Sequence, residues 1–165
     1  MGTSPSKYNY FKIESGKMAA SGNIMFLMDK TGELKDLSSK DYCYFHMFQN
    51  CTSLTKAPVF PATTLASNCY NGMFYGCTSL TQAPALPAMT LAYYCYAYMF
   101  EDCTSLSKPK YKMPNLTFDQ VAINIQNNSI LGNGYFDDSI HVQCSDKILI
   151  AISDDETWQW IITEG

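Results

Sequence analysis

One five-residue phrase occurs three times in this chain at a fixed spacing of 26 residues. The copies begin at Cys51, Cys77 and Cys103, and each reads Cys-Thr-Ser-Leu followed by Thr or Ser. A fixed period of this length is typical of a solenoid, in which each unit buries its apolar side only against its neighbours. The spacing therefore predicts a stack of short units, and it allows the copies to be compared with one another.

Other positions recur in the same register over roughly residues 37–109, which hold two complete units, half a unit before them and the start of another. The copies share a Cys-Tyr pair, which begins at Cys43, Cys69 and Cys95, and a Met-Phe pair four residues later. Two copies also share a link of the form Ala-Pro-x-x-Pro. Because proline fixes the backbone of the link and excludes helix before it, each unit is expected to comprise a strand, an extended link and a helix.

The helix predicted for the central unit spans about Leu65 to Tyr75, with Thr63 or Thr64 as its cap and Gly76 at its end. At ~100° per residue, the positions that recur between copies fall on one half of this helix. The positions that differ between copies fall on the other half. We therefore expect the recurring half to be core and the variable half to face solvent.

The flanks of the repeats predict two caps, since the outer units of a solenoid need cover. Residues 1–36 are expected to form an N-terminal β cap with strands at 8–14 and 23–28. Residues 110–165 are expected to form a C-terminal cap. The elements predicted in it are a helix at 118–126, capped by Asn115 or Thr117, and a β-meander at 140–144, 147–152 and 157–163. The predicted fold class is thus an α/β repeat, a short strand-helix solenoid at 37–109 between β-rich caps.

The stretch from Cys69 to Thr81, CYNGMFYGCTSLT, followed by APALPA at 83–88, resembles the BspA-like leucine-rich repeat family. The repeated pattern covers a little under half of the chain. Members of this family are repeat proteins of bacterial surfaces, abundant in gut anaerobes. The resemblance implies a curved solenoid used for adhesion or partner binding, and it implies no catalytic residues.

Two phrases in the C-terminal part, which begin at Phe118 and Trp160, resemble short structural proteins of gut phages. The first six residues lack the basic and apolar regions of a signal peptide, so the protein is not exported by that route or the signal has been removed. The expected location is extracellular, on a bacterial cell surface or in a phage virion.

Charge is unevenly distributed. All 11 basic residues are lysines, and Lys56 is the only charged residue between Thr52 and Phe100. Nucleic-acid binding needs basic stripes, and a net charge of −4 argues against it. No apolar run approaches the ~18 residues of a membrane helix, so membrane insertion is not expected.

The variable half of the predicted helices is rich in Tyr, Asn and Gly, a composition that resembles antibody paratopes. The candidate binding residues are Tyr42, His46, Tyr75, Tyr93, Tyr94 and Tyr98. The expected partner is a host cell-surface protein or glycan; the alternative is self-association or packing against a larger particle. Two further interpretations stay open: the tyrosines only tolerate a solvent-exposed surface, or strand-side Thr and Ser bind instead.

The seven cysteines are predicted to be buried free thiols. Eight helical residues between Cys69 and Cys77 would rise ~12 Å, which is too far for a disulfide. Disulfides between stacked units remain an alternative. A zinc site is another, although structural zinc favours Cys-x-x-Cys pairs and the sequence has none.

The sequence contains no nucleophile elbow, phosphate loop or HExxH motif. His46 and His141 are its only histidines, and each is expected to be solvated. The acidic clusters at 137–138 and 154–156 lack the ligand spacing of a calcium loop. We therefore expect a non-enzymatic protein without a cofactor or metal.

Overall fold

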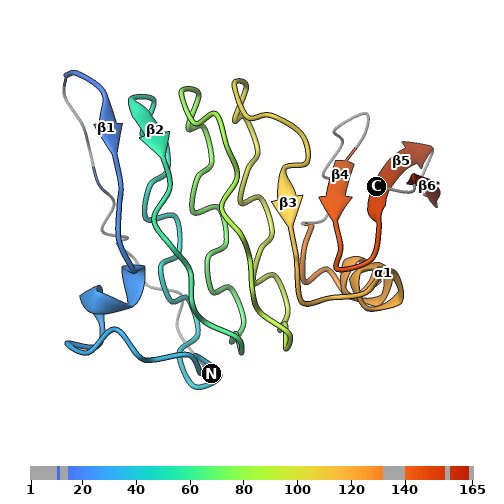
Figure 1. Cartoon of the computed structure of the whole chain (residues 1–165), viewed down its shortest axis with the longest axis horizontal. Helices are drawn as coiled ribbons and strands as arrows, with labels where there is room; N and C mark the ends of the chain where they lie inside the picture. The colour runs from blue at the N-terminus through green and yellow to red at the C-terminus, as the bar shows by residue number, and fades with distance from the viewer. Residues whose placement is uncertain (1–10, 12–14, 132–139, 155–156, 164–165) are drawn as a thin grey trace.

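The computed structural model describes residue 11 and residues 15–131, 140–154 and 157–163. Its elements lie in a row, with the repeats between β1 and β3 and the C-terminal sheet beyond them (Figure 1). In chain order the elements are β1 (Met18–Ala19), the 3-10 helix η1 (Ile24–Leu27), β2 (Leu54–Lys56), β3 (Tyr111–Lys112), α1 (Phe118–Gln126), β4 (Ile140–Gln143), β5 (Ile148–Asp154) and β6 (Thr157–Thr163).

Backbone hydrogen bonds join consecutive repeats at equivalent positions. In the first repeat, alternate N–H groups donate to the carbonyl of the residue 25 places later, as from His46 to Asn71 at 2.9 Å. The central repeat donates to the third in the same way, as from Gly72 to Ala97 at 2.8 Å. Parallel bridges through Thr64 add a second line of contact between the three repeats. The repeats therefore lie side by side along the long axis of the molecule (Figure 1).

The segment predicted as a helix is a run of turns over residues 67–76. Asn68, Tyr70 and Gly72 have φ angles of 59°, 61° and 57°, in the left-handed region that a right-handed helix excludes. The residues between them donate three residues back, as from Cys69 to the Ala66 carbonyl. The helical part of the prediction is wrong because half of the backbone donors serve the neighbouring repeat and cannot form an i to i−4 ladder.

The recurring positions form the core, as predicted. Tyr44, Tyr70 and Tyr96 stack face to face, with ring centroids 5.6 and 6.0 Å apart. An equivalent stack of phenylalanines has separations of 5.6 and 5.8 Å, and its members are Phe48, Phe74 and Phe100. Burying a side chain of this size contributes roughly 1.5–3 kcal/mol. The stacked rings are thus a main source of cohesion between repeats.

The predicted solvent half is wrong at three residues, one of which is the buried Gly72. Asn71 is 4% exposed, and Ala97, at the same position of the next repeat, is fully buried. A run of turns does not divide its side chains into two halves as a helix does, so part of the variable set lies inside.

All seven cysteines are buried free thiols, as predicted. Several thiols donate to a backbone carbonyl of the preceding repeat. Cys77 Sγ lies 3.0 Å from the Phe48 oxygen, and Cys103 Sγ lies 3.0 Å from the Phe74 oxygen. The recurring cysteines therefore satisfy backbone acceptors as well as filling the core.

The N-terminal part differs from the prediction. The strand expected at 23–28 is the 3-10 helix η1, which Asn23 caps by accepting a hydrogen bond from the Met25 N–H. A continuous apolar run suits either element, and here this capping bond favours a helical turn. The strand that pairs with β2, in parallel, is β1. Apart from Phe11, the strand predicted at 8–14 lies outside the described residues.

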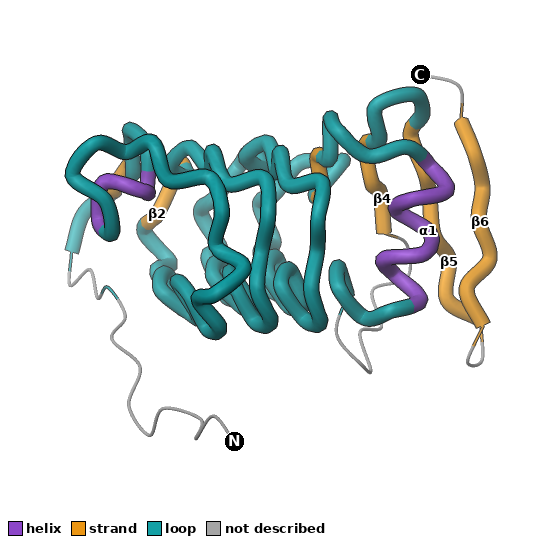
Figure 2. The backbone as a smooth tube through the Cα atoms, turned by 90° about the horizontal axis from the view of Figure 1, so that it is seen from below, coloured by secondary structure: helices purple, strands orange, loops and turns teal. Residues whose placement is uncertain are grey.

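The C-terminal part agrees with the prediction. α1 spans Phe118–Gln126 and begins at Thr117, whose side chain forms a capping box with Gln120. β4, β5 and β6 form an antiparallel meander, and α1 lies beside it (Figure 2). β3 pairs with β4 in parallel and bridges to Ala85, which joins the sheet to the repeats.

Candidate binding surface

The six candidate residues lie on the turns of the repeats. Tyr93 is 50% exposed, and the others are half-buried. Four of them have left-handed backbones, with φ angles of 52–60°. These four are Tyr42, His46, Tyr94 and Tyr98. A left-handed backbone costs a non-glycine residue roughly 1–2 kcal/mol, so the turns place bulky side chains where Gly or Asn would suit the backbone better.

Tyr93, Tyr94 and Tyr98 form one group, named here the tyrosine cluster. The Tyr93 and Tyr94 rings stack with centroids 4.0 Å apart, and the Tyr94 and Tyr98 centroids are 6.1 Å apart. The Tyr94 N–H donates to the Asn128 carbonyl at 2.9 Å, which ties the cluster to the segment after α1. Hydrogen bonding to Tyr94 raises the pKa of Tyr93, and burial raises the pKa of Tyr98. Both phenols are therefore neutral hydrogen-bonding groups at pH 7.

A second aromatic group occupies the first repeat. Phe45 lies between Tyr42, at 5.4 Å, and His46, at 4.1 Å between ring centroids. Phe45 is not among the residues predicted from the sequence, although its position differs between repeats (Phe45, Asn71 and Ala97) and a comparison of the repeats could have found it.

The central repeat separates the two aromatic groups and carries small polar residues. Asn71 donates through its amide to the Asn68 side chain at 3.1 Å. Gly72 leaves room that His46 occupies: a Cβ atom added to Gly72 would lie 2.5 Å from His46 Nε2. The candidate surface thus runs from the aromatic side chains of the first repeat, past the half-buried Asn68, to the tyrosine cluster.

Tyr75 has a different neighbour. A hydrogen bond with Asp102, on the next repeat, raises the pKa of Tyr75. Tyr75 is therefore engaged with a carboxylate and does not belong to the tyrosine cluster.

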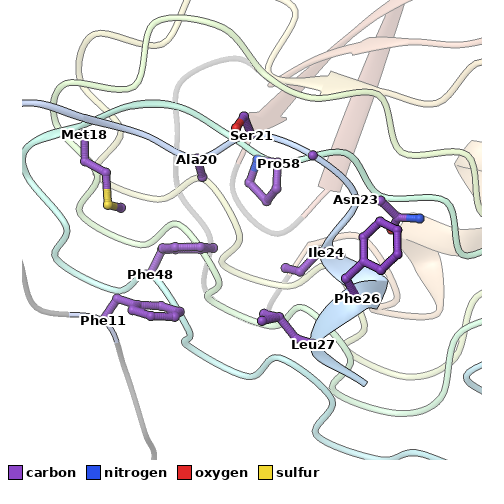
Figure 3. A pocket seen from close by; sticks show the side chains of 11 residues that line it. Phe11, Met18, Ala20, Ser21, Asn23, Ile24, Phe26, Leu27, Phe48 and Pro58 are labelled. Atoms are coloured by element: carbon purple, nitrogen blue, oxygen red, sulfur yellow. The ribbon is translucent and has the colours of Figure 1, made fainter. Parts of the chain in front are cut away.

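Sequence reasoning also missed an apolar pocket at the β1 end of the row (Figure 3). Its volume is about 380 Å³, and it is named here the end pocket. The side chains of Phe26 and Leu27 on its wall are each 60% exposed. Phe11 and Phe48 stack on the opposite wall at 5.3 Å. The amide of Asn23 is already used, because it donates to the Gly32 carbonyl and accepts from Met25. The pocket therefore suits an apolar group.

The described residues contain no group of three or more His, Cys, Asp or Glu side chains placed to hold a metal ion. Cys95 and Cys103 are poor nucleophiles, because burial raises the pKa of each thiol to about 12 and both stay protonated at pH 7. The available chemistry at the candidate surface is aromatic contact and hydrogen bonding.

No family model matches this chain, and searches of curated proteins and of solved structures also found no match. The likeness to BspA-like repeats accordingly stays a hypothesis. Among the described residues, no helix combines the length and the apolar character that a membrane span requires.

Proposed function

We propose that this protein is a non-enzymatic binding module of a bacterial surface or a phage virion, and that its stacked repeats form a short solenoid of the BspA-like kind. Its partner is a host glycan or protein, which it contacts through the tyrosine cluster. The observation that carries the proposal is the stacking of the exposed Tyr93 ring on the half-buried Tyr94 ring. Stacked tyrosines offer a large contact area at low entropic cost, together with polar hydroxyl groups.

The backbone of the surface supports the proposal. Tyr94 and Tyr98 adopt left-handed φ angles of 58° and 56°, whereas the equivalent residues of the central repeat are Asn68 and Gly72. A left-handed backbone is common to these turns, since the core residue Tyr70 also has a φ of 61°. The support for the proposal is that the third repeat carries tyrosines where the central repeat has Asn and Gly, the residues that suit such a backbone.

The Asn68 amide of the central repeat supplies a second element of recognition. Asn68 is half-buried beside the tyrosine cluster, and its N–H donates to the Tyr93 carbonyl. Amide groups next to aromatic rings suit a ligand with both hydroxyl groups and apolar faces, as sugars and peptide side chains have.

The experiment incubates fluorescently labelled protein with a panel of intact gut bacteria. We expect saturable binding that is lost in the triple variant Tyr93→Ser, Tyr94→Ser, Tyr98→Ser. The matched control is Tyr75→Ser, which removes a tyrosine engaged with Asp102 outside the cluster. Competition by free sugars identifies a glycan partner, and loss of binding after protease treatment of the cells identifies a protein. Binding that the triple variant retains would place the site elsewhere.

The end pocket favours a second candidate function, an assembly protein that packs against itself or a larger particle. Exposed Phe26 and Leu27 beside an apolar cavity are typical of an interaction surface. Light scattering tests this candidate: self-association should be lost in the variant Phe26→Ser, Leu27→Ser. Association that this variant retains would count against the end pocket as the contact.

A further inference from the structure

Among the described strands, the C-terminal sheet has one edge strand without a second neighbour. Its strand order is β3-β4-β5-β6. On the β3 side, Lys112 bridges in parallel to Ala85, so the sheet continues into the repeats. On the other side, β6 pairs with β5 over its whole length and with no further strand of the described chain. β6 therefore ends the row that begins at β1 (Figures 1 and 2).

The two ends of the row differ in how their edges are protected. β1 has two residues, and its register with β2 is shifted between Met18 and Ala19. A short, irregular edge strand resists pairing with another chain. β6 has seven residues, reads Thr-Trp-Gln-Trp-Ile-Ile-Thr, and contains no charge, proline or glycine. Within its seven residues, β6 thus lacks the charges and the proline that keep an edge strand from pairing.

We propose that β6 of one copy pairs with β6 of a second copy, antiparallel, about a two-fold axis at Trp160. Alternate N–H and C=O groups of an edge strand point away from its one neighbour, so each β6 would supply the donors and acceptors that the other needs. A two-fold axis requires a surface that is complementary to itself, and an antiparallel pair of identical strands meets this requirement. The four-stranded sheets of the two copies then become one continuous sheet.

The residue pairs in this register are compatible. Thr157 faces Thr163 of the partner subunit, and Trp158 faces Ile162 of the partner subunit. Thr–Thr pairs and aromatic pairs with β-branched residues are among the favourable cross-strand neighbours. No like charges face each other within the seven residues. The register therefore favours a second copy as the occupant of the edge.

Pairing through β6 also bears on binding, because a dimer carries two tyrosine clusters. Two linked sites bind a surface with many ligands more tightly than one site does. The inference does not depend on the tyrosine cluster, and its failure would leave the proposed function untouched.

The experiment is sedimentation velocity of the whole chain from about 1 μM to about 1 mM. Runs at about 0.15 M and about 0.5 M salt are compared, because salt screens the acidic residues 155, 156 and 164 that flank β6 in the sequence as well as the charges introduced by the variants. We expect a monomer of 18.5 kDa in equilibrium with a dimer of twice that mass. The variant Thr157→Lys, Thr163→Lys places two pairs of like charges across the axis and should weaken dimerisation about fivefold or more.

The matched control is Thr157→Lys, Thr163→Glu, which changes the same two positions but places opposite charges across the axis. It should dimerise at least as tightly as the unmodified chain. Far-ultraviolet circular dichroism and a urea titration establish that both variants fold. A chain that stays monomeric throughout the range overturns the proposal. So does a dimer that both variants weaken equally, or one that only Phe26→Ser, Leu27→Ser abolishes.

Discussion

Tyr44 and Tyr70 stack in parallel, 5.6 Å apart, but their hydroxyl groups differ in bonding. The Tyr44 hydroxyl donates to the Ile24 carbonyl at 3.0 Å. The Tyr70 hydroxyl is buried and has no hydrogen-bond partner in the described structure. The two residues hold equivalent positions in consecutive repeats, so a half-buried phenol with a hydrogen-bond partner can be compared with a fully buried phenol without one.

This difference predicts opposite effects of one substitution. Tyr70→Phe removes an unsatisfied polar group and should raise the free energy of unfolding by up to ~1 kcal/mol. Tyr44→Phe deprives the Ile24 carbonyl of its donor and should lower it by ~1 kcal/mol. Both variants keep the ring stack, so urea unfolding compares the hydroxyl groups alone. Equal destabilisation by the two variants would contradict the assignment of the hydrogen bonds.

The turns predict that alanine at Gly72 is poorly tolerated. Gly72 has a φ of 57°, and a Cβ atom there would meet the His46 ring at 2.5 Å. Backbone strain alone costs roughly 1–2 kcal/mol, and the steric clash adds to it. Thermal unfolding of Gly72→Ala should therefore show a larger loss of stability than Gly16→Ala.

Gly16 is the matched control because its φ is 82° but a Cβ atom would meet nothing within 4 Å. The double variant His46→Gly, Gly72→Ala tests the clash directly. The double variant should lose no more stability, relative to the unmodified chain, than Gly16→Ala does, because the clash is gone and only the backbone strain remains. A double variant less stable than Gly72→Ala would mean that His46 stabilises the turn through other contacts.

The period, the core and the C-terminal elements could be predicted from the sequence. Tyr70 and Phe74 recur at equivalent positions of the other repeats. This recurrence identified them as buried residues, and it did not depend on the conformation of the backbone between them. Thr117 and Gln120 marked the start of α1, because a capping box is a local signal.

The backbone of the repeats could not be predicted from periodicity. Apolar residues at i, i+3 and i+4 fit a helix, but the turns of this chain produce the same spacing. The signal for turns lay in Asn68, Gly72 and Gly76, which favour left-handed φ angles. Tyrosines at equivalent positions obscured it. The end pocket was missed because it depends on contacts between Phe11, η1 and Phe48, which are distant in sequence.

Buried thiols predict a loss of stability at alkaline pH. Burial raises the pKa of Cys144 to about 11 and that of Cys103 to about 12, from 9.0 when unperturbed. A raised pKa in the folded state contributes stability that is fully present below pH ~8.5 and is lost as the pH rises toward the folded pKa. Each such thiol should lower the free energy of unfolding by up to ~1.4 kcal/mol per pH unit above 9.

Urea titrations at pH 7, 8, 9 and 10 measure this loss. The unfolding free energy should be constant between pH 7 and 8 and should fall between 9 and 10. Cys144→Ala should reduce the slope above pH 9, because one fewer thiol ionises on unfolding. An unchanged slope in that variant would mean that Cys144 ionises in the folded state at the same pH as in the unfolded chain.

The final prediction separates the core from the tyrosine cluster. Leu80 is fully buried in the central repeat, and Leu80→Asp introduces an unpaired buried charge that costs several kcal/mol. This loss is comparable to the whole stability of a small domain, roughly 5–15 kcal/mol, so cooperative thermal unfolding should disappear. Tyr94→Ser removes a half-buried ring from the surface and should change the free energy of unfolding by no more than ~1 kcal/mol. Equal damage from the two substitutions would show that the tyrosine cluster stabilises the fold, and the case for binding through it would then lose its main support.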